Sequence, residues 1–204
     1  MKQEERRQQT TELLLDSTKK LIQEKGCHSI TMKDIMEKSG LSKGAIFHYV
    51  KSKDEIFAWV LQERLERTNE RFMNEVKQGR KNFDGPMQRL AESFTALENP
   101  KDVTSKVLIY LLGKEDQPII AEVLKQYYER SVHLSGQWIL TGQQYGVIPE
   151  SVNTDKTAEM FVLLSLGLRV RSSIPLASAV FNSQDYSSYI INILNPSEPP
   201  PLTC

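Results

Sequence analysis

Cysteine and histidine are scarce in this chain of 204 residues, which has two cysteines and three histidines. Cys27 and Cys204 lie far apart in the sequence, and the histidines do not group with them at the spacing of metal ligands. A disulfide framework and a metal site are therefore not expected. Cys27 could act as a redox sensor, but a free cysteine is more often a small buried packing residue, and we expect burial.

Long apolar runs are also missing. No window of about 18 uncharged apolar residues exists, and the first twenty residues are charged rather than a basic stretch followed by an apolar one. We therefore expect neither a membrane span nor a signal peptide, and we expect a cytoplasmic protein that does not bind membranes.

Motifs for catalysis are absent as well. The chain has no G-x-S-x-G elbow, no phosphate-binding Gly-rich loop and no H-E-x-x-H pair, and most carboxylates lie beside Lys or Arg as on solvated helix faces. We expect a protein that is not an enzyme and needs no cofactor.

Charge is balanced over the whole chain but not along it. The formal net charge is zero with a pI of about 6.8, whereas residues 1–53 carry 11 Lys and Arg against 7 Asp and Glu, a balance of +4, and residues 54–204 carry −4. Chance alone could produce such a difference. Because phosphates dominate non-specific affinity for nucleic acid, the imbalance would direct DNA to the N-terminal part.

The stretch from Gly26 to Glu55 is the most informative part of the chain. Thr31 with Asp34 three residues later predicts the N-cap of a short helix, and Gly40 predicts its end. Ser42 then predicts the cap of a second helix over Lys43 to Tyr49. Two short helices joined by a Gly turn are the layout of a helix-turn-helix DNA-binding motif.

Residues 12 to 60 closely resemble the DNA-binding domain of the TetR (tetracycline-repressor) family of bacterial regulators. The resemblance is carried by Leu14, Leu15, Asp16, Leu21, Ile22, Lys25 and Gly26, then by Ile30, Thr31, Asp34 and Ile35, the run Gly40 to Tyr49, and Lys53 to Ile56. It covers about a quarter of the chain. Cys27 and Val50 depart from it, since the family often has aromatic residues there.

The residues of this motif suggest two kinds of DNA contact. Lys43 can donate to guanine O6 and N7, Ala45 can touch a thymine methyl, and Gly44 allows close approach, so we expect base contacts from Ser42, Lys43, Gly44, Ala45 and His48. We expect phosphate contacts from Thr31, Lys33, Tyr49, Lys51 and Lys53. Ile46 and Phe47 are expected to pack inward against Ile30 and Ile35.

The rest of the chain has helical periodicity with no convincing strand pattern. A long connecting helix is predicted over Lys53 to Arg80, and further helices over Met87 to Leu97, Thr104 to Leu112, Pro118 to Tyr145, Thr154 to Arg171 and Asp185 to Leu194. The prediction is an all-α protein with a three-helix DNA-binding domain over 1–53, a larger helical ligand-binding and dimerisation domain over 54–195, and a disordered Pro-rich tail over 196–204.

Two apolar sets in the larger domain have alternative interpretations. The last two helices are expected to form a homodimer interface, as the resemblance implies, or else the core of a monomer, with Phe161, Leu164, Gly167, Leu168, Tyr189, Ile190 and Ile193. A second set could line a pocket for a small apolar or amphipathic ligand, although each member alone is more often plain core: Met87, Leu90, Phe94, Leu108, Tyr110, Leu111, Tyr127 and Trp138. Arg169 and Arg171 are expected at the interface rim rather than at an anionic ligand.

The resulting hypothesis is a homodimeric transcriptional regulator, a repressor released from a palindromic double-stranded DNA operator by a small-molecule ligand. The alternative is a helical ligand-binding or adaptor protein whose helix-turn-helix no longer binds DNA. A steep loss of DNA affinity with rising salt discriminates between them.

Overall fold

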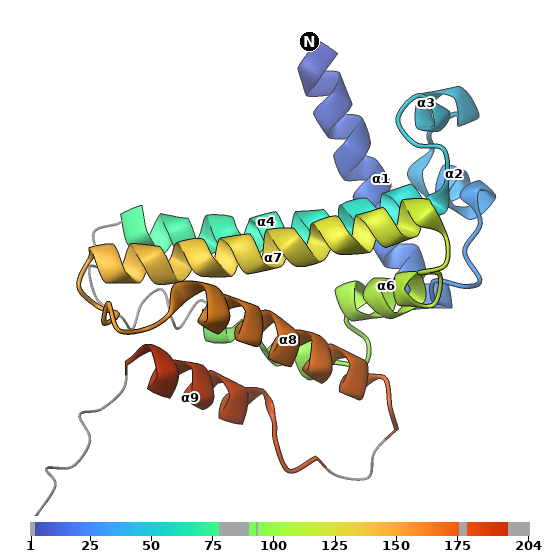
Figure 1. Cartoon of the computed structure of the whole chain (residues 1–204). Coiled ribbons are helices and arrows are strands. Elements are labelled where there is room, and N and C mark those ends of the chain that lie inside the picture. The colour runs from blue at the N-terminus through green and yellow to red at the C-terminus, as the bar shows by residue number, and fades with distance from the viewer. Residues whose placement is uncertain (1–2, 78–89, 93, 176–178, 196–204) are drawn as a thin grey trace, which may run out of the picture. The chain divides into compact units, whose positions relative to one another are not determined.

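The computed structural model describes residues 3–77, 90–92, 94–175 and 179–195 (Figure 1). Every regular element in these ranges is a helix, so the predicted all-α class is confirmed. Internal contacts divide the chain into unit 1, Met1–Leu65 with Pro100–Tyr127, and unit 2, Glu66–Asn99 with Tyr128–Cys204. The predicted domain boundary after residue 53 lies within unit 1. It remains a prediction about function, because contact density does not define a functional domain.

Unit 1 contains the predicted helix-turn-helix. Its helices are α1 (Gln3–Lys25), α2 (Met32–Ser39), α3 (Lys43–Phe47), α6 (Val103–Leu112) and the first parts of α4 (Lys53–Lys77) and α7 (Pro118–Gln144). Branched and aromatic side chains at helical spacing are fully buried between them: Leu14, Ile22, Ile30, Ile35, Ile46, Ile56 and Phe57. Each such side chain stabilises the fold by about 1.5–3 kcal/mol.

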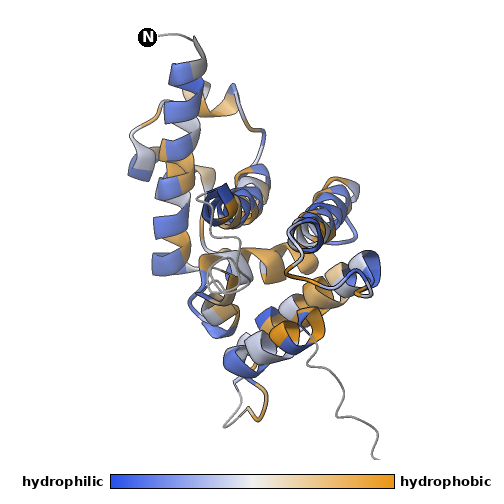
Figure 2. Ribbon diagram, turned by 90° about the vertical axis from the view of Figure 1, so that its left-hand side faces the viewer, coloured by the Kyte–Doolittle hydropathy of each residue, from blue (hydrophilic) through white to orange (hydrophobic). Residues whose placement is uncertain are grey.

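Unit 2 holds the remainder of α4 and α7, helical residues 90–92 and 94, the 3-10 helix η1 (Thr95–Glu98), α8 (Thr154–Ser172) and α9 (Ser183–Leu194). One apolar cluster joins α4, α7, α8 and α9, with Phe72, Ile139, Phe161 and Ile190 among its members. Figure 2 shows hydrophobic residues interleaved with hydrophilic ones along the helices, the pattern of amphipathic helices. Tyr186 is buried in this core, and its hydroxyl donates to the Phe161 carbonyl at 2.7 Å.

The predicted helix bounds agree with the structure within a few residues wherever the structure describes them. The exceptions are the helix predicted over Lys43 to Tyr49, which is α3 and ends at Phe47, and the one predicted over Met87 to Leu97, whose described end is the 3-10 helix η1. The predicted end of the long helix at Arg80, the start of the next at Met87 and the Pro-rich tail lie outside the described residues.

None of the described helices offers an apolar stretch long enough to cross a lipid bilayer. Across the same part of the chain, no three His, Cys, Asp or Glu side chains come together as a group able to hold a metal ion.

Candidate nucleic-acid interface

The first helix of the motif, α2, is fixed at both ends by its own sequence. The Thr31 hydroxyl accepts from the backbone N–H of Asp34 at 3.2 Å, and the Asp34 carboxylate accepts from the Thr31 N–H at 2.8 Å, which makes a reciprocal capping box. At the other end Gly40 has a φ of +68° and donates its N–H to the Met36 carbonyl. This left-handed conformation strains any residue with a Cβ, so glycine is required there.

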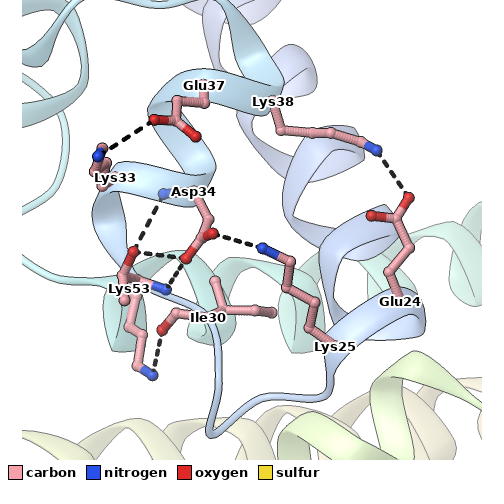
Figure 3. A network of polar contacts seen from close by, with 9 residues as sticks. Glu24, Lys25, Ile30, Lys33, Asp34, Glu37, Lys38 and Lys53 are labelled. Atoms are coloured by element: carbon pink, nitrogen blue, oxygen red, sulfur yellow. Dashed lines mark hydrogen bonds and ion pairs between the residues drawn. The ribbon is translucent and has the colours of Figure 1, made fainter.

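Ion pairs hold α2 against the end of α1 (Figure 3). Lys25 pairs with Asp34 at 2.7 Å, and Lys38 pairs with Glu24 at 2.7 Å. The hydrogen bond from Lys25 and those from Thr31 hold the pKa of the Asp34 carboxyl well below its ordinary value. The motif therefore keeps several of its cations for internal contacts, and these are not available to a phosphate without breaking a pair.

The second helix, α3, begins at an exposed turn. Ser42 caps it by accepting from the Ala45 N–H at 3.2 Å, and Ile46 anchors it in the core. The helix is only five residues long, and the backbone N–H groups of Tyr49 and Val50 both donate to the Ile46 carbonyl beyond its end. The first turn of α3 is therefore exposed to solvent, while the Ser42 cap and the buried Ile46 hold the helix in place.

Of the residues expected to contact bases, Ser42, Lys43, Gly44 and His48 are exposed, and Ala45 is half-buried. The structure therefore brings all five to one short segment. The expectation that Phe47 packs inward is wrong, because 42% of its surface is exposed and its ring centroid lies 5.7 Å from the Lys43 Nζ. Spacing could have shown this, since residues four apart share a helix face and Lys43 was placed outward.

The residues expected to contact phosphates are differently engaged. Lys51 is exposed, and Lys33 is exposed with only a 3.7 Å ion pair to Glu37. The Thr31 hydroxyl is committed to its helix cap, and Tyr49 is half-buried. Lys51 and Lys33 are therefore the members of this set whose ammonium groups remain accessible.

Lys53 is held by the protein itself. Its ammonium donates to the carbonyl oxygens of Ile30 at 2.7 Å, Cys27 at 3.1 Å and His28 at 3.4 Å, and it lies 5.2 Å from the ring centroid of Tyr110. Burial is the main cause that lowers its pKa. Lys53 therefore holds the loop between α1 and α2 through its hydrogen bonds. Sequence analysis did not foresee these contacts, because the partners are backbone atoms.

Comparison with known proteins agrees with this geometry. Residues 14–60 match the family model of bacterial regulatory proteins, tetR family. The HTH-type transcriptional regulator UidR of Escherichia coli K12 is 24% identical over 162 residues, which are 79% of this chain and 80% of that protein. Residues 14–60 therefore belong to the TetR family of DNA-binding domains.

Solved structures of TetR-like fold extend the likeness over almost the whole chain. Salmonella enterica GusR gives a TM-score of 0.62 with 22% identity over 91% of this chain and 95% of that one. A regulator from Saccharomonospora viridis, solved in complex with choline, gives a TM-score of 0.63 with 19% identity over 91% and 95%. The protein is thus a DNA-binding TetR-type transcriptional regulator, and the prediction that it is not an enzyme is confirmed by these relatives.

The residues expected to line a ligand pocket divide between the two units. Leu108, Tyr110, Leu111 and Tyr127 belong to unit 1, whereas Leu90, Phe94 and Trp138 belong to unit 2. Met87 lies outside the described residues. The Tyr110 hydroxyl, expected to meet a ligand, instead donates to Asp54 at 3.0 Å. In unit 2 the Trp138 Nε1 donates to the Asn69 side chain at 2.9 Å.

The residues expected at a dimer interface also divide into two groups. Phe161, Leu168 and Ile190 are buried within the single chain, and Leu164 and Ile193 are half-buried. Gly167 and Tyr189 are exposed. The helix face of α8 that carries Gly167 also exposes Leu163 and Val170. Sequence analysis did not single out Leu163, because it did not separate the two apolar faces of this helix.

Three further residues had expected places. Arg169 was expected at a rim, but only 7% of it is exposed, so that expectation is wrong. Arg171 donates to the Glu98 carboxylate and to the Phe181 carbonyl. Cys27 is buried as expected, and burial raises the pKa of its thiol to about 11, which opposes formation of a reactive thiolate.

Proposed function

We propose that the protein is a homodimeric repressor that binds a palindromic operator through α3 and is released by a small molecule bound in its helical body. The observation that carries this proposal is the exposed first turn of α3. No carboxylate of the described side chains pairs with Lys43, although carboxylates pair with the neighbouring Lys25, Lys33 and Lys38. A cation left unpaired on a rigid, capped helix is suited to an external acceptor.

Base contacts follow from the side chains of this turn. Lys43 would donate to O6 and N7 of guanine in the major groove, and the Ala45 methyl would contact a thymine methyl. A Cβ built on Gly44 meets nothing within 4 Å, and Gly44 does not have a positive φ. Neither packing nor backbone geometry therefore demands glycine at this position, which supports a role in close approach to DNA.

Phosphate contacts would come from the cations that remain accessible. Lys51 follows α3 directly, and Lys33 on α2 has only its exposed pair with Glu37 to lose. An exposed pair at that separation contributes little, about 0–1 kcal/mol, so a phosphate can replace it. Lys53 is left out of this surface because its hydrogen bonds are made inside the protein.

Dimerisation is supported by the exposed apolar face of α8. Leu163, Gly167 and Val170 lie at positions i, i+4 and i+7 and therefore on one face, and the two larger side chains are 55% and 42% exposed. A Cβ on Gly167 meets nothing within 4 Å, so the packing of the single chain does not require glycine. Close crossing of α8 with α8 or α9 of a second copy would use both features.

Release by a ligand would need a connection between its site and α3. Helix α4 contributes residues to both units, and Lys53 at its start holds the loop that precedes α2. A ligand that shifts α4 would thereby change the spacing of the two α3 helices in a dimer. A ligand bound among the apolar side chains of unit 2 would be small and apolar or amphipathic. The neighbour from Saccharomonospora viridis was solved in complex with choline, a small organic cation, which supports a small molecule as the ligand but not its apolar character.

The experiment that tests the proposal selects genomic DNA fragments bound by the purified protein and maps the protected bases. A footprint with two-fold symmetry, protected by one dimer and lost on addition of a metabolite, is expected. Asymmetric protection by a monomer would contradict the dimer. Failure to enrich any fragment would favour the adaptor alternative.

A further inference from the structure

Phe47, the last residue of α3, is an aromatic side chain that the core of unit 1 does not use. Its surface is 42% exposed, whereas Ile46 and Val50 on either side of it are buried and anchor the segment. An exposed phenyl ring gains little of the stabilisation that burial of an aromatic side chain provides. Packing therefore does not explain an aromatic residue at this position.

The Phe47 ring lies beside the turn that begins α3. Side chains of a helix point back toward its N-terminus, so the ring extends along the preceding turn. Its centroid lies 5.7 Å from the Lys43 Nζ, which comes from the same helix face four residues earlier. Single exposed aromatic residues are common on protein surfaces, but this one is placed next to an exposed cation on the helix of a DNA-binding motif. The turn therefore presents a cation and an apolar ring side by side.

The major groove of DNA offers a matching pair of groups. Guanine presents the acceptors O6 and N7 to a lysine, and thymine presents its C5 methyl to an apolar side chain. Neighbouring bases of one strand are about 3.4 Å apart along the axis, so a separation of 5.7 Å corresponds to one or two base-pair steps. The occupant of this surface is double-stranded DNA, because Phe47 lies within the residues 14–60 that match a family of DNA-binding domains.

We propose that Phe47 determines part of the operator sequence by contacting the C5 methyl of a thymine that lies one or two base pairs from the guanine contacted by Lys43. This inference rests on the proposed function, since it assumes that the first turn of α3 enters the major groove. It gives each half-site a thymine at a defined distance from a guanine. Phe47 distinguishes thymine from bases without this methyl by burial of apolar surface, not by a hydrogen bond.

The first part of the test changes the DNA and uses the wild-type protein. Each thymine of a selected operator is replaced in turn by deoxyuridine, which keeps the base pair and the O4 acceptor and loses only the methyl. We expect a replacement at the thymine contacted by Phe47 to weaken binding about fourfold in each half-site, the ratio that burial of one methyl group provides. With cytosine at that position, 5-methylcytosine should bind about fourfold better than cytosine, because it restores the methyl.

The second part assigns the methyl contact to a side chain, since the Ala45 methyl is also expected to meet a thymine. Phe47→Ala and Phe47→Gln should bind the thymine and deoxyuridine operators equally at one position. Phe47→Leu keeps an apolar side chain and should retain most of the preference for thymine. Leu112→Ala is the matched control and should keep the full preference, because Leu112 is a large apolar side chain of unit 1, 41% exposed, that lies on α6 outside the motif.

Three results would overturn the proposal in different ways. If no thymine of the operator is sensitive to deoxyuridine while the wild type binds it specifically, recognition of a methyl group is refuted and operator binding stands. If the Phe47→Ala and Phe47→Gln variants keep the wild-type ratio at every sensitive thymine, another side chain contacts the methyl and the role of Phe47 is refuted. If the wild type selects no DNA fragment, this inference and the proposed function are both refuted.

Discussion

The junction between α4 and α6 gives the sharpest prediction about what stabilises unit 1. Asp54, in the first turn of α4, accepts a hydrogen bond from the Tyr110 hydroxyl at 3.0 Å and pairs with the Lys114 ammonium at 2.8 Å. The side chains of Asp54 and Lys114 are 15% and 27% exposed. Burial lowers the pKa of Lys114, but the hydrogen bonds to Asp54 and Tyr110 outweigh it and raise that pKa. The Lys114 Nζ also lies 4.5 Å from the ring centroid of Tyr110.

Two substitutions separate the contributions at this junction. Tyr110→Phe removes one hydrogen bond to a charged acceptor and should lower the free energy of unfolding by about 1.5 kcal/mol. Asp54→Ala removes the acceptor of both partners and leaves the Tyr110 hydroxyl buried without it, so the loss should reach about 3 kcal/mol. The Lys114 ammonium is exposed enough to be solvated in the Asp54→Ala variant, so the lost ion pair adds little to this decrease.

Urea unfolding of the single and double variants measures these losses. In a double-mutant cycle, Asp54→Ala and Tyr110→Phe should couple by about 1 kcal/mol, because each removes the same hydrogen bond. Lys125→Met on the exposed face of α7 is a control for loss of a charged side chain outside this junction and should change the free energy of unfolding by less than about 0.5 kcal/mol. Strict additivity of Asp54→Ala and Tyr110→Phe would refute the reasoning.

Three further predictions concern other parts of the molecule. Lys53→Met should lower the free energy of unfolding by about 2 kcal/mol, because it leaves three carbonyl oxygens without their donor. The same variant should leave the salt slope of DNA binding unchanged. A flatter slope would show that Lys53 contacts a phosphate. Val170→Glu should split the dimer in sedimentation while circular dichroism still shows a folded chain, whereas Leu168→Glu should unfold it; a Val170→Glu dimer would contradict the proposed face. Burial raises the pKa of Tyr186 to about 12, so the phenol of the unfolded state, with a pKa of about 10, loses its proton first. The contribution of Tyr186 to the free energy of unfolding should therefore be fully present below about pH 10 and be lost between about pH 10 and 12. In unfolding titrations Tyr186→Phe should remove much of this decline, and an unchanged decline would refute the assignment.

The parts of the fold that sequence predicted best are those with local causes. The capping box of Thr31 and Asp34, the positive φ of Gly40 and the Ser42 cap all depend on residues within four positions of each other, and all are present in the structure. Ser52, directly before α4, likewise accepts from the Glu55 N–H as a local helix cap. Helix existence and bounds followed from the same local signals.

Sequence reasoning predicted least where an outcome depends on distant partners. The hydrogen bonds of Lys53 to backbone carbonyls and of Tyr110 to Asp54 were not foreseen, because these partners lie far away in the sequence. Apolar residues on α8 gave too little information about which face meets the chain's own core, since this helix is apolar on more than one side. Burial of Leu168 and exposure of Leu163 separate those faces only in three dimensions.

The central claim is that the first turn of α3 reads operator bases while accessible lysines around it bind phosphates. The most direct measurement compares Lys43→Ala with Lys51→Ala on a selected operator and on a panel of its single-base variants, at several salt concentrations. Lys43→Ala should lose about 1–3 kcal/mol of specific binding and relax preference at one base pair in each half-site, whereas Lys51→Ala should weaken all sequences equally and flatten the salt slope by about one unit per contact. Equal and sequence-independent losses for both variants would contradict the claim.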